Sequence, residues 1–181
     1  MIFLFLFLSD VEEIKYIGNR EYIPNVVETI KKAKHTVDIV MYSAGYYPTH
    51  PEGPDRLLYG AMFDAVKRGV RVRVILESAN WNLSNTRKNE IAANYLKEGG
   101  VEIFWDPPDI TTHSKIVIVD TLYCVVGSTN WTYYAFAHNN ESSVLVKSRE
   151  LGERMNQFFE DLLRVSTKTL NIEEESGEEE L

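Results

Sequence analysis

The strongest constraint on the fold is an alternation along the chain between short β-rich runs and segments of helical spacing. Residues 36–42 and 70–76 are rich in β-branched side chains, which favours strands. Tyr22, Val26 and Ile30 recur at helical spacing within a predicted helix over residues 20–34. Further helices are expected after Asp55, taken as an N-cap, and over residues 85–97, with a short strand at 101–104. Helices and strands in this order predict an α/β domain.

The pattern changes in the second half of the chain. Residues 114–119 and 122–126 are two β-rich runs joined by Asp120-Thr121, which predicts an antiparallel hairpin. A last strand over 142–147 leads into a helix with Ser148 as its N-cap. We therefore expect a mixed, largely parallel sheet flanked by helices on both faces.

The two ends of the chain differ from this body. Residues 2–8 are Ile, Phe and Leu only, which predicts a strand buried on both faces, although a leader or a membrane-surface anchor stays open. Residues 173–181 hold six Glu, and removing them from the formal net charge of -8 leaves -2. We expect one catalytic domain over residues 1–165 and an acidic, disordered tail over 166–181.

Composition excludes few function classes. The hydrophobic content of 44% and the charged content of 25% are those of a globular protein. The single cysteine, Cys124, rules out a disulfide within the chain or a cysteine-rich zinc site. A nearly neutral body neither supports nor excludes a nucleic-acid partner. One cysteine and a charged tail suit a cytoplasmic protein, while the apolar N-terminal run leaves secretion or membrane association open.

Chemistry is concentrated around His113 and Lys115. The two residues are two positions apart on a predicted strand, so both side chains leave the same face. A neutral imidazole can attack phosphorus, and an adjacent ammonium can stabilise the phosphate anion. A pair of this kind is common by itself, so its meaning depends on what else the fold brings to it.

A second group of polar residues follows the hairpin. Ser128 and Asn130 come directly after Gly127 and are expected to open a helix, whose free N–H groups would complete an oxyanion pocket. Glu141, at the start of the last predicted strand, could hold an imidazole in one tautomer. The full pattern, H-x-K-x-x-x-x-D followed by G-S-x-N, is long and specific.

This pattern resembles the HKD motif of the phospholipase D superfamily. It is most similar to the small members with a single motif, such as the Nuc-type endonucleases and the mitochondrial cardiolipin hydrolase/Zucchini group. Residues 30–42 and 65–73 resemble the first two helix–strand units of that family. The resemblance covers roughly residues 22 to 148 and implies the phospholipase D-like fold.

The resemblance also implies roles at the matching positions. His113 would attack phosphorus and form a phosphohistidine, while Lys115 and Asn130 would bind the non-bridging oxygens with help from Ser128. Glu141 would orient a catalytic histidine. No metal or other cofactor would be required. Because superfamily catalysis uses two such motifs and only one is present, the resemblance implies a homodimer that shares one site.

Asp120 is the motif acid, yet it lies five residues beyond Lys115 and at the predicted turn, so we interpret it as structural. Zucchini-like members carry a Cys/His zinc element and a membrane-targeting helix, which argues against a mitochondrial type here. His35 and His138 receive no catalytic role. Several residues could contact substrate but are equally compatible with core, loop or solvated positions: Tyr46, His50, Trp81, Trp105, Arg68, Arg71, Arg73, Arg87 and Lys88.

The leading hypothesis is a metal-independent phosphodiesterase that cleaves DNA or RNA with little sequence preference. A phospholipase D or cardiolipin hydrolase would use the same chemistry, and the apolar N-terminal run is the feature that favours a lipid substrate. A non-catalytic nucleic-acid-binding module is the hypothesis from a different class.

Overall fold

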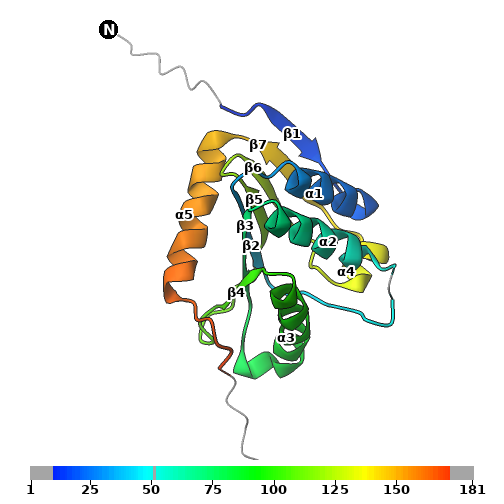
Figure 1. The fold of residues 1–181 in the computed structure, drawn as a ribbon, viewed down its shortest axis with the longest axis vertical. Coiled ribbons are helices and arrows are strands. Elements are labelled where there is room, and N and C mark those ends of the chain that lie inside the picture. The colour runs from blue at the N-terminus through cyan, green and yellow to red at the C-terminus, as the bar shows by residue number, and fades with distance from the viewer. Residues whose placement is uncertain (1–9, 51, 172–181) are drawn as a thin grey trace, which may run out of the picture.

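The structure, a computed structural model, describes residues 10–50 and 52–171, so the predicted strand over residues 2–8 and the glutamate-rich end lie outside the described residues. The described chain folds around a seven-stranded mixed sheet in the order β1-β7-β6-β5-β2-β3-β4 (Figure 1). The strands are β1 (Glu13–Tyr16), β2 (Thr36–Met41), β3 (Arg71–Leu76), β4 (Glu102–Trp105), β5 (Lys115–Val119), β6 (Tyr123–Gly127) and β7 (Ser143–Lys147).

Pairing divides this sheet into two halves. Strands β2, β3 and β4 are parallel, whereas β2–β5, β5–β6, β6–β7 and β7–β1 are antiparallel. The predicted mixed sheet is confirmed, but the parallel share is smaller than expected. Every strand after β4 joins the sheet by antiparallel pairing. Strand β1, which was not predicted, adds a further antiparallel pair.

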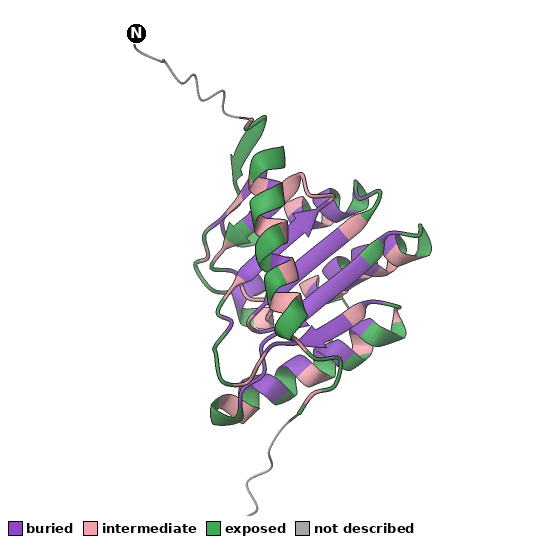
Figure 2. Ribbon diagram, turned by 90° about the vertical axis from the view of Figure 1, so that its left-hand side faces the viewer, coloured by how far each residue is buried: buried purple, intermediate pink, exposed green. Residues whose placement is uncertain are grey.

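Helices cover both faces of the sheet, as expected. Four helices lie on one face: α1 (Tyr22–Lys31), α2 (Pro54–Lys67), α3 (Leu83–Glu98) and α4 (Tyr133–Ala137). Figure 2 shows α5 (Arg149–Val165) lying alone across the opposite face, with its outer side exposed and the strands behind it buried. Within the described residues, no helix combines the length and the apolar character needed to cross a bilayer.

Alternation along the strands assigns side chains to the two layers. Ile39 and Met41 of β2 join the main core beneath the four helices, whereas Val40 packs with Phe159 of α5. The α5 face also buries a charged pair, in which Arg73 donates to Asp38 at 2.6 Å. Since Lys115 lies two residues before Val117 of the main core, its side chain leaves on the four-helix face.

Several predicted boundaries change. Helix α2 begins at Pro54 with Gly53 as N-cap, so Asp55 is not the cap; its carboxylate accepts from the Tyr47 N–H instead. The Asp120–Thr121 turn is confirmed, with both residues at a φ of 52°. The Ser148 N-cap is also confirmed, since its hydroxyl accepts from the Leu151 N–H.

The disordered tail predicted from residue 166 does not begin there. Thr167 pairs with Trp105 at the end of β4, and Leu170 packs against the main core. Residues 166–171 therefore belong to the folded body. After α5 the chain passes along the edge of β4, where it gains a strand partner and an apolar contact.

Candidate active site

The predicted site residues come together at one edge of the sheet. Lys115 opens β5 opposite Met41, the last residue of β2, and Gly127 closes β6 opposite Ser143 of β7. An open pocket of about 370 Å³ at this edge is lined by His113, Lys115, Gly127, Ser128 and Asn130. Chain reversals on both sides thus bring residues that are far apart in sequence to a single hollow.

Lys115 is buried although it carries an ammonium group, with 7% of its surface exposed. Its Nζ donates to the backbone carbonyl of His113 at 2.8 Å and lies 4.9 Å from the centre of the Tyr42 ring. Burial lowers the pKa of Lys115, and the carboxylates of Glu141 and Glu77 act against that shift. An ammonium has three donors, so Lys115 can still offer hydrogen bonds to an anion in the pocket.

The imidazole of His113 is exposed and packs edge-on against Tyr42, with 4.5 Å between the ring centres. Burial, followed by the positive charge of Lys115, lowers the pKa of His113. The neutral form, which carries the lone pair needed for attack, is therefore favoured near neutral pH. In the described part of the chain, no hydrogen bond reaches this imidazole from its own protomer.

The side-chain amide of Asn130 has one atom whose hydrogen bonding is unsatisfied. Its Oδ1 is buried and has no hydrogen-bond partner among the described residues. A buried polar atom in that state costs about 1–3 kcal/mol, so the amide is suited to completing its hydrogen bonds with a ligand. With Oδ1 on the buried side, the NH₂ is the part of the amide that can face the pocket and donate to a phosphate oxygen.

The helix expected to open at Ser128–Asn130 is not there. Helix α4 starts only at Tyr133, with Thr132 as its N-cap. The reason is that Trp131 is held as an extended residue: its N–H donates to Ser43 and its carbonyl accepts from Gly45. The pocket therefore has no helix N-terminus, and that part of the predicted oxyanion pocket was wrong.

Ser128 and Glu141 are linked across the pocket rim. The Ser128 hydroxyl donates to one carboxylate oxygen of Glu141 and accepts from the Ser142 N–H at 3.0 Å. The other Glu141 oxygen accepts from the side chain of Asn139 at 3.0 Å. Ser128 thus lines the pocket but uses its hydroxyl to hold Glu141, and no described hydrogen bond joins Glu141 to the His113 of the same chain.

Asp120 lies at the opposite end of β5 from Lys115. Its carboxylate accepts from three successive backbone N–H groups, those of residues 34, 35 and 36, at 2.8, 2.8 and 2.9 Å. Hydrogen bonds from Thr36, Lys34 and His35 outweigh the opposing effect of burial and lower the pKa of Asp120. These contacts are structural, because they join the hairpin turn to the start of β2.

A buried carboxyl pair beneath the His113 loop was missed. Glu77 and Asp106 are 1% and 2% exposed and directly follow β3 and β4. Glu77 accepts from the Thr112 N–H at 2.5 Å, and Asp106 accepts from the Ser78 N–H at 2.6 Å. The signal available in the sequence was a polar residue directly after each of two neighbouring parallel strands, where functional groups of α/β sheets gather.

This pair binds a proton. One oxygen of Glu77 and one of Asp106 are buried without a partner, and ionised carboxylates only accept hydrogen bonds. Burial, followed by the hydrogen bond and negative charge of Asp106, raises the pKa of Glu77 to about 8. A protonated Glu77 can donate to Asp106, so the pair keeps one negative charge near Lys115 and anchors Thr112, the residue before His113.

The remaining candidates divide by location. Trp105 is buried in the core, and Arg71 and Arg73 are held in ion pairs with Glu102 and with Asp38 at the far end of β3. These three residues do not reach the pocket, and neither does Arg68, which donates to the end of α1. Trp81, Arg87 and Lys88 do lie at the same end of the sheet as His113, on η2 (Asn80–Asn82) and the first half of α3.

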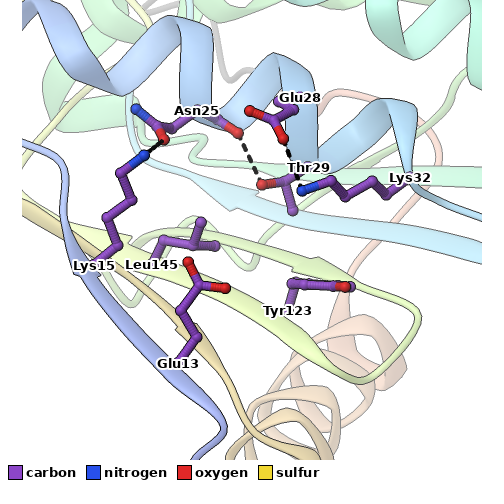
Figure 3. Close-up of a pocket in the computed structure, with 8 residues that line it drawn as sticks. All are labelled: Glu13, Lys15, Asn25, Glu28, Thr29, Lys32, Tyr123 and Leu145. Carbon is purple, nitrogen blue, oxygen red and sulfur yellow. Dashed lines mark hydrogen bonds and ion pairs between the residues drawn. The ribbon is translucent and has the colours of Figure 1, made fainter.

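A smaller pocket of about 50 Å³ lies between α1 and strands β1, β6 and β7 (Figure 3). Three of its four charged groups are already engaged, since Lys15 donates to Asn25 and Lys32 bridges to Glu28. It lies at the Tyr123 end of β6, whereas the His113 pocket lies at the Gly127 end. Among residues 10–50 and 52–171, no three His, Cys, Asp or Glu side chains form a group that could hold a metal ion.

Comparison with known proteins identifies relatives of this arrangement. The family described as cardiolipin synthase, PLD-like domain, matches residues 26–163. A phospholipase D of Rickettsia prowazekii is 27% identical over 128 residues, covering 71% of this chain and 56% of that protein. The mitochondrial cardiolipin hydrolase of Mus musculus is 29% identical over 99 residues, covering 55% and 41%. The chain thus spans about half the length of the curated relatives it matches.

Among solved structures, Nuc from Salmonella typhimurium, a phospholipase D family member, superimposes with a TM-score of 0.70. The identity is 24%, and the alignment covers 85% of this chain and 97% of that one. At this level of identity the similarity establishes the shared fold.

Proposed function

Because the chain belongs to the phospholipase D superfamily, we propose that it is a metal-independent phosphodiesterase that cleaves DNA or RNA with little sequence preference. The observation that carries this proposal is the single pocket in which His113, Lys115 and Asn130 meet. A nucleophile whose neutral form is favoured, a buried cation and an unsatisfied amide are the groups that displacement at a phosphodiester requires.

The reaction proceeds in two displacements. A ring nitrogen of His113 attacks phosphorus, the bond to the leaving oxygen breaks, and a second imidazole gives that oxygen its proton. The same second imidazole then takes a proton from water, whose oxygen attacks the phosphohistidine and releases His113. Lys115 and Asn130 bind the non-bridging oxygens, on which negative charge is concentrated during both steps.

The second imidazole is the His113 of a partner chain. Two features support a shared site: the described part of one chain holds one such motif, and its imidazole lacks a hydrogen bond from its own protomer. Trp81 and Ile110 are 65% and 72% exposed beside the loop that carries His113, and they offer apolar surface for the contact. In such a dimer, Glu141 would orient one of the two catalytic histidines.

The experiment is cleavage of single-stranded DNA, duplex DNA and RNA by the purified protein in EDTA. We expect activity without added metal and complete loss in His113→Asn, because the nucleophile is then absent. Activity that EDTA abolishes and a divalent metal restores would contradict the mechanism. Binding of nucleic acid without cleavage of any phosphodiester would instead support the binding-module alternative.

The shared site has its own test. Activity per chain should fall on dilution below the dimer dissociation constant, measured by sedimentation under the same conditions. Mixing His113→Asn with Lys115→Ala chains should not restore wild-type activity, because the shared site of the mixed dimer lacks one imidazole and one ammonium. Full activity from a demonstrated monomer would rule out the shared site.

A phospholipase is the second candidate, favoured by the identity of the relatives, phospholipase D and mitochondrial cardiolipin hydrolase. The test is flotation with cardiolipin-containing liposomes, with and without residues 1–8, together with release of the lipid head group. Absence of liposome binding in a protein with intact nuclease activity would remove this candidate.

A further inference from the structure

Five aromatic rings on α4, at its C-cap and in the loop after β2 form a cluster, named the Tyr133 cluster, whose α4 part begins three residues after Asn130 of the His113 pocket. Tyr133 is its centre, with ring centres of Tyr47, His50, Tyr134 and His138 between 5.3 and 6.1 Å away. The angles between these ring planes and that of Tyr133 run from 34° to 84°. None of the four rings stacks in parallel on Tyr133, so ring faces in the cluster stay available to a planar ligand. Tyr134 is the most accessible of the three tyrosines for the test, with 68% of its surface exposed.

Hydrogen bonds join this cluster to the segment that directly follows Asn130. Tyr133 follows Asn130 by three residues, and its N–H donates to the Tyr47 hydroxyl at 3.2 Å. The segment before it is tied to the loop after β2, because Trp131 pairs with Ser43 and Gly45 at 2.8 and 2.7 Å. In Figure 1 the same loop runs alongside α4. The contacts of the Tyr133 ring with Tyr47 and His50 therefore join two distant parts of the sequence in one cluster.

A basic groove continues from the other side of Tyr47. It has a volume of about 490 Å³, and Tyr46, Ser84, Arg87, Lys88 and Ile91 line it together with Tyr47. Arg87 and Lys88 are exposed and form no ion pair with any described residue, in contrast to Arg71 and Arg73. The chain has a net charge of -8, but these two unpaired cations make the groove locally positive. A locally positive groove is suited to phosphate groups.

We propose that the Tyr133 cluster stacks unpaired bases next to the scissile phosphate and that Arg87 and Lys88 bind neighbouring phosphates, so the preferred substrate is single-stranded nucleic acid. This proposal rests on the proposed function. Aromatic faces beside a cationic groove bind single strands with little sequence preference, because every base has a π-face. In a duplex those faces are already stacked. The cluster consists of Tyr and His, which suit base contact better than they suit acyl chains.

The test measures binding to His113→Asn protein, which holds substrate without turnover. The probes are a fluorescent single-stranded DNA of roughly 12 nucleotides, a duplex of the same sequence, and an abasic oligomer of equal length. Tyr134→Ala should weaken binding of the base-bearing single strand by about 5- to 150-fold, with little change for the abasic oligomer. Tyr134→Phe should bind like the parent, since the ring is kept, and Phe158→Ala on α5 is the matched control.

The cationic groove has a separate readout. Arg87→Gln should lower the slope of log affinity against log salt for the single strand by about 0.7. Lys97→Gln, at the far end of the same helix, should leave the slope unchanged. Equal slopes for Arg87→Gln and its parent would remove the groove from the proposal.

The outcomes separate this inference from the proposed function. If the wild-type protein cleaves DNA or RNA while Tyr134→Ala binds the base-bearing strand as tightly as its parent, only the inference is wrong. It is also wrong if Tyr134→Ala loses binding to cardiolipin-containing vesicles but not to the oligonucleotide, since the cluster is then a membrane contact. A wild-type protein that neither binds nor cleaves any oligonucleotide overturns both.

Discussion

Replacing Glu77 by glutamine should flatten the pH dependence of stability between about pH 5 and pH 8. Glu77 and Asp106 face each other in the core with one oxygen each unpartnered, so the folded pair retains a proton. Glutamine has no proton to lose. Its carbonyl can still accept from Thr112, and its NH₂ can donate to Asp106, so the fold should be kept.

The magnitude follows from linkage. The ordinary pKa of Glu77 is 4.5 and its folded value is about 8, so between these pH values the folded state binds a proton that the unfolded state does not. The stability from this proton is fully present below the unfolded value, decreases by about 1.4 kcal/mol per pH unit, and is lost above the folded value. Over the whole interval the total is on the order of 5 kcal/mol. The decrease per pH unit corresponds to about 3–6 °C in Tm.

The assay is thermal unfolding of the wild type, Glu77→Gln and Glu98→Gln across this pH range. Glu98 is an exposed residue at the end of α3, and its variant should follow the wild-type curve. Other groups titrate alike in all three proteins, so the difference between the wild-type and Glu77→Gln curves isolates the pair. Parallel curves for these two proteins would show that Glu77 is ionised throughout, and the shared-proton interpretation would be refuted.

Three further predictions concern the frame of the site. Asp120→Ala should lower the free energy of unfolding in urea by about 2–4 kcal/mol, because the backbone N–H groups of residues 34–36 lose their acceptor; an unchanged midpoint would contradict this role. Gly127→Ala places a Cβ 2.1 Å from the Ser143 hydroxyl and 2.4 Å from a backbone carbonyl, so it should cost about 1–3 kcal/mol in the same assay, whereas a cost near zero would show that the strands can separate. Burial raises the pKa of Cys124 to about 11, so iodoacetamide should label the native thiol far more slowly than the urea-unfolded one, and equal rates would mean that the thiol is accessible.

The sequence by itself determined the elements that depend on local periodicity. The alternation along β5 predicted which face Lys115 leaves, although the strand begins only at Lys115 and His113 lies in the loop before it rather than on the predicted strand. Asp120-Thr121 was enough to predict the hairpin. The last helix and its Ser148 cap follow from spacing and capping chemistry. Each of these features depends on residues within a few positions of one another, so no knowledge of strand order was required.

Only the tertiary structure decided what surrounds His113. Tyr42 contacts His113, and Glu77 anchors Thr112, because β5 pairs with β2 and because the sheet brings the end of β3 beneath this loop. Backbone pairing of this kind also replaced the helix expected at Ser128. Such contacts join residues tens of positions apart, and their free energy depends on which strands become neighbours, which no local propensity encodes. The sequence alone therefore points to His113, whereas the contacts that lower the pKa of its imidazole arise only on folding.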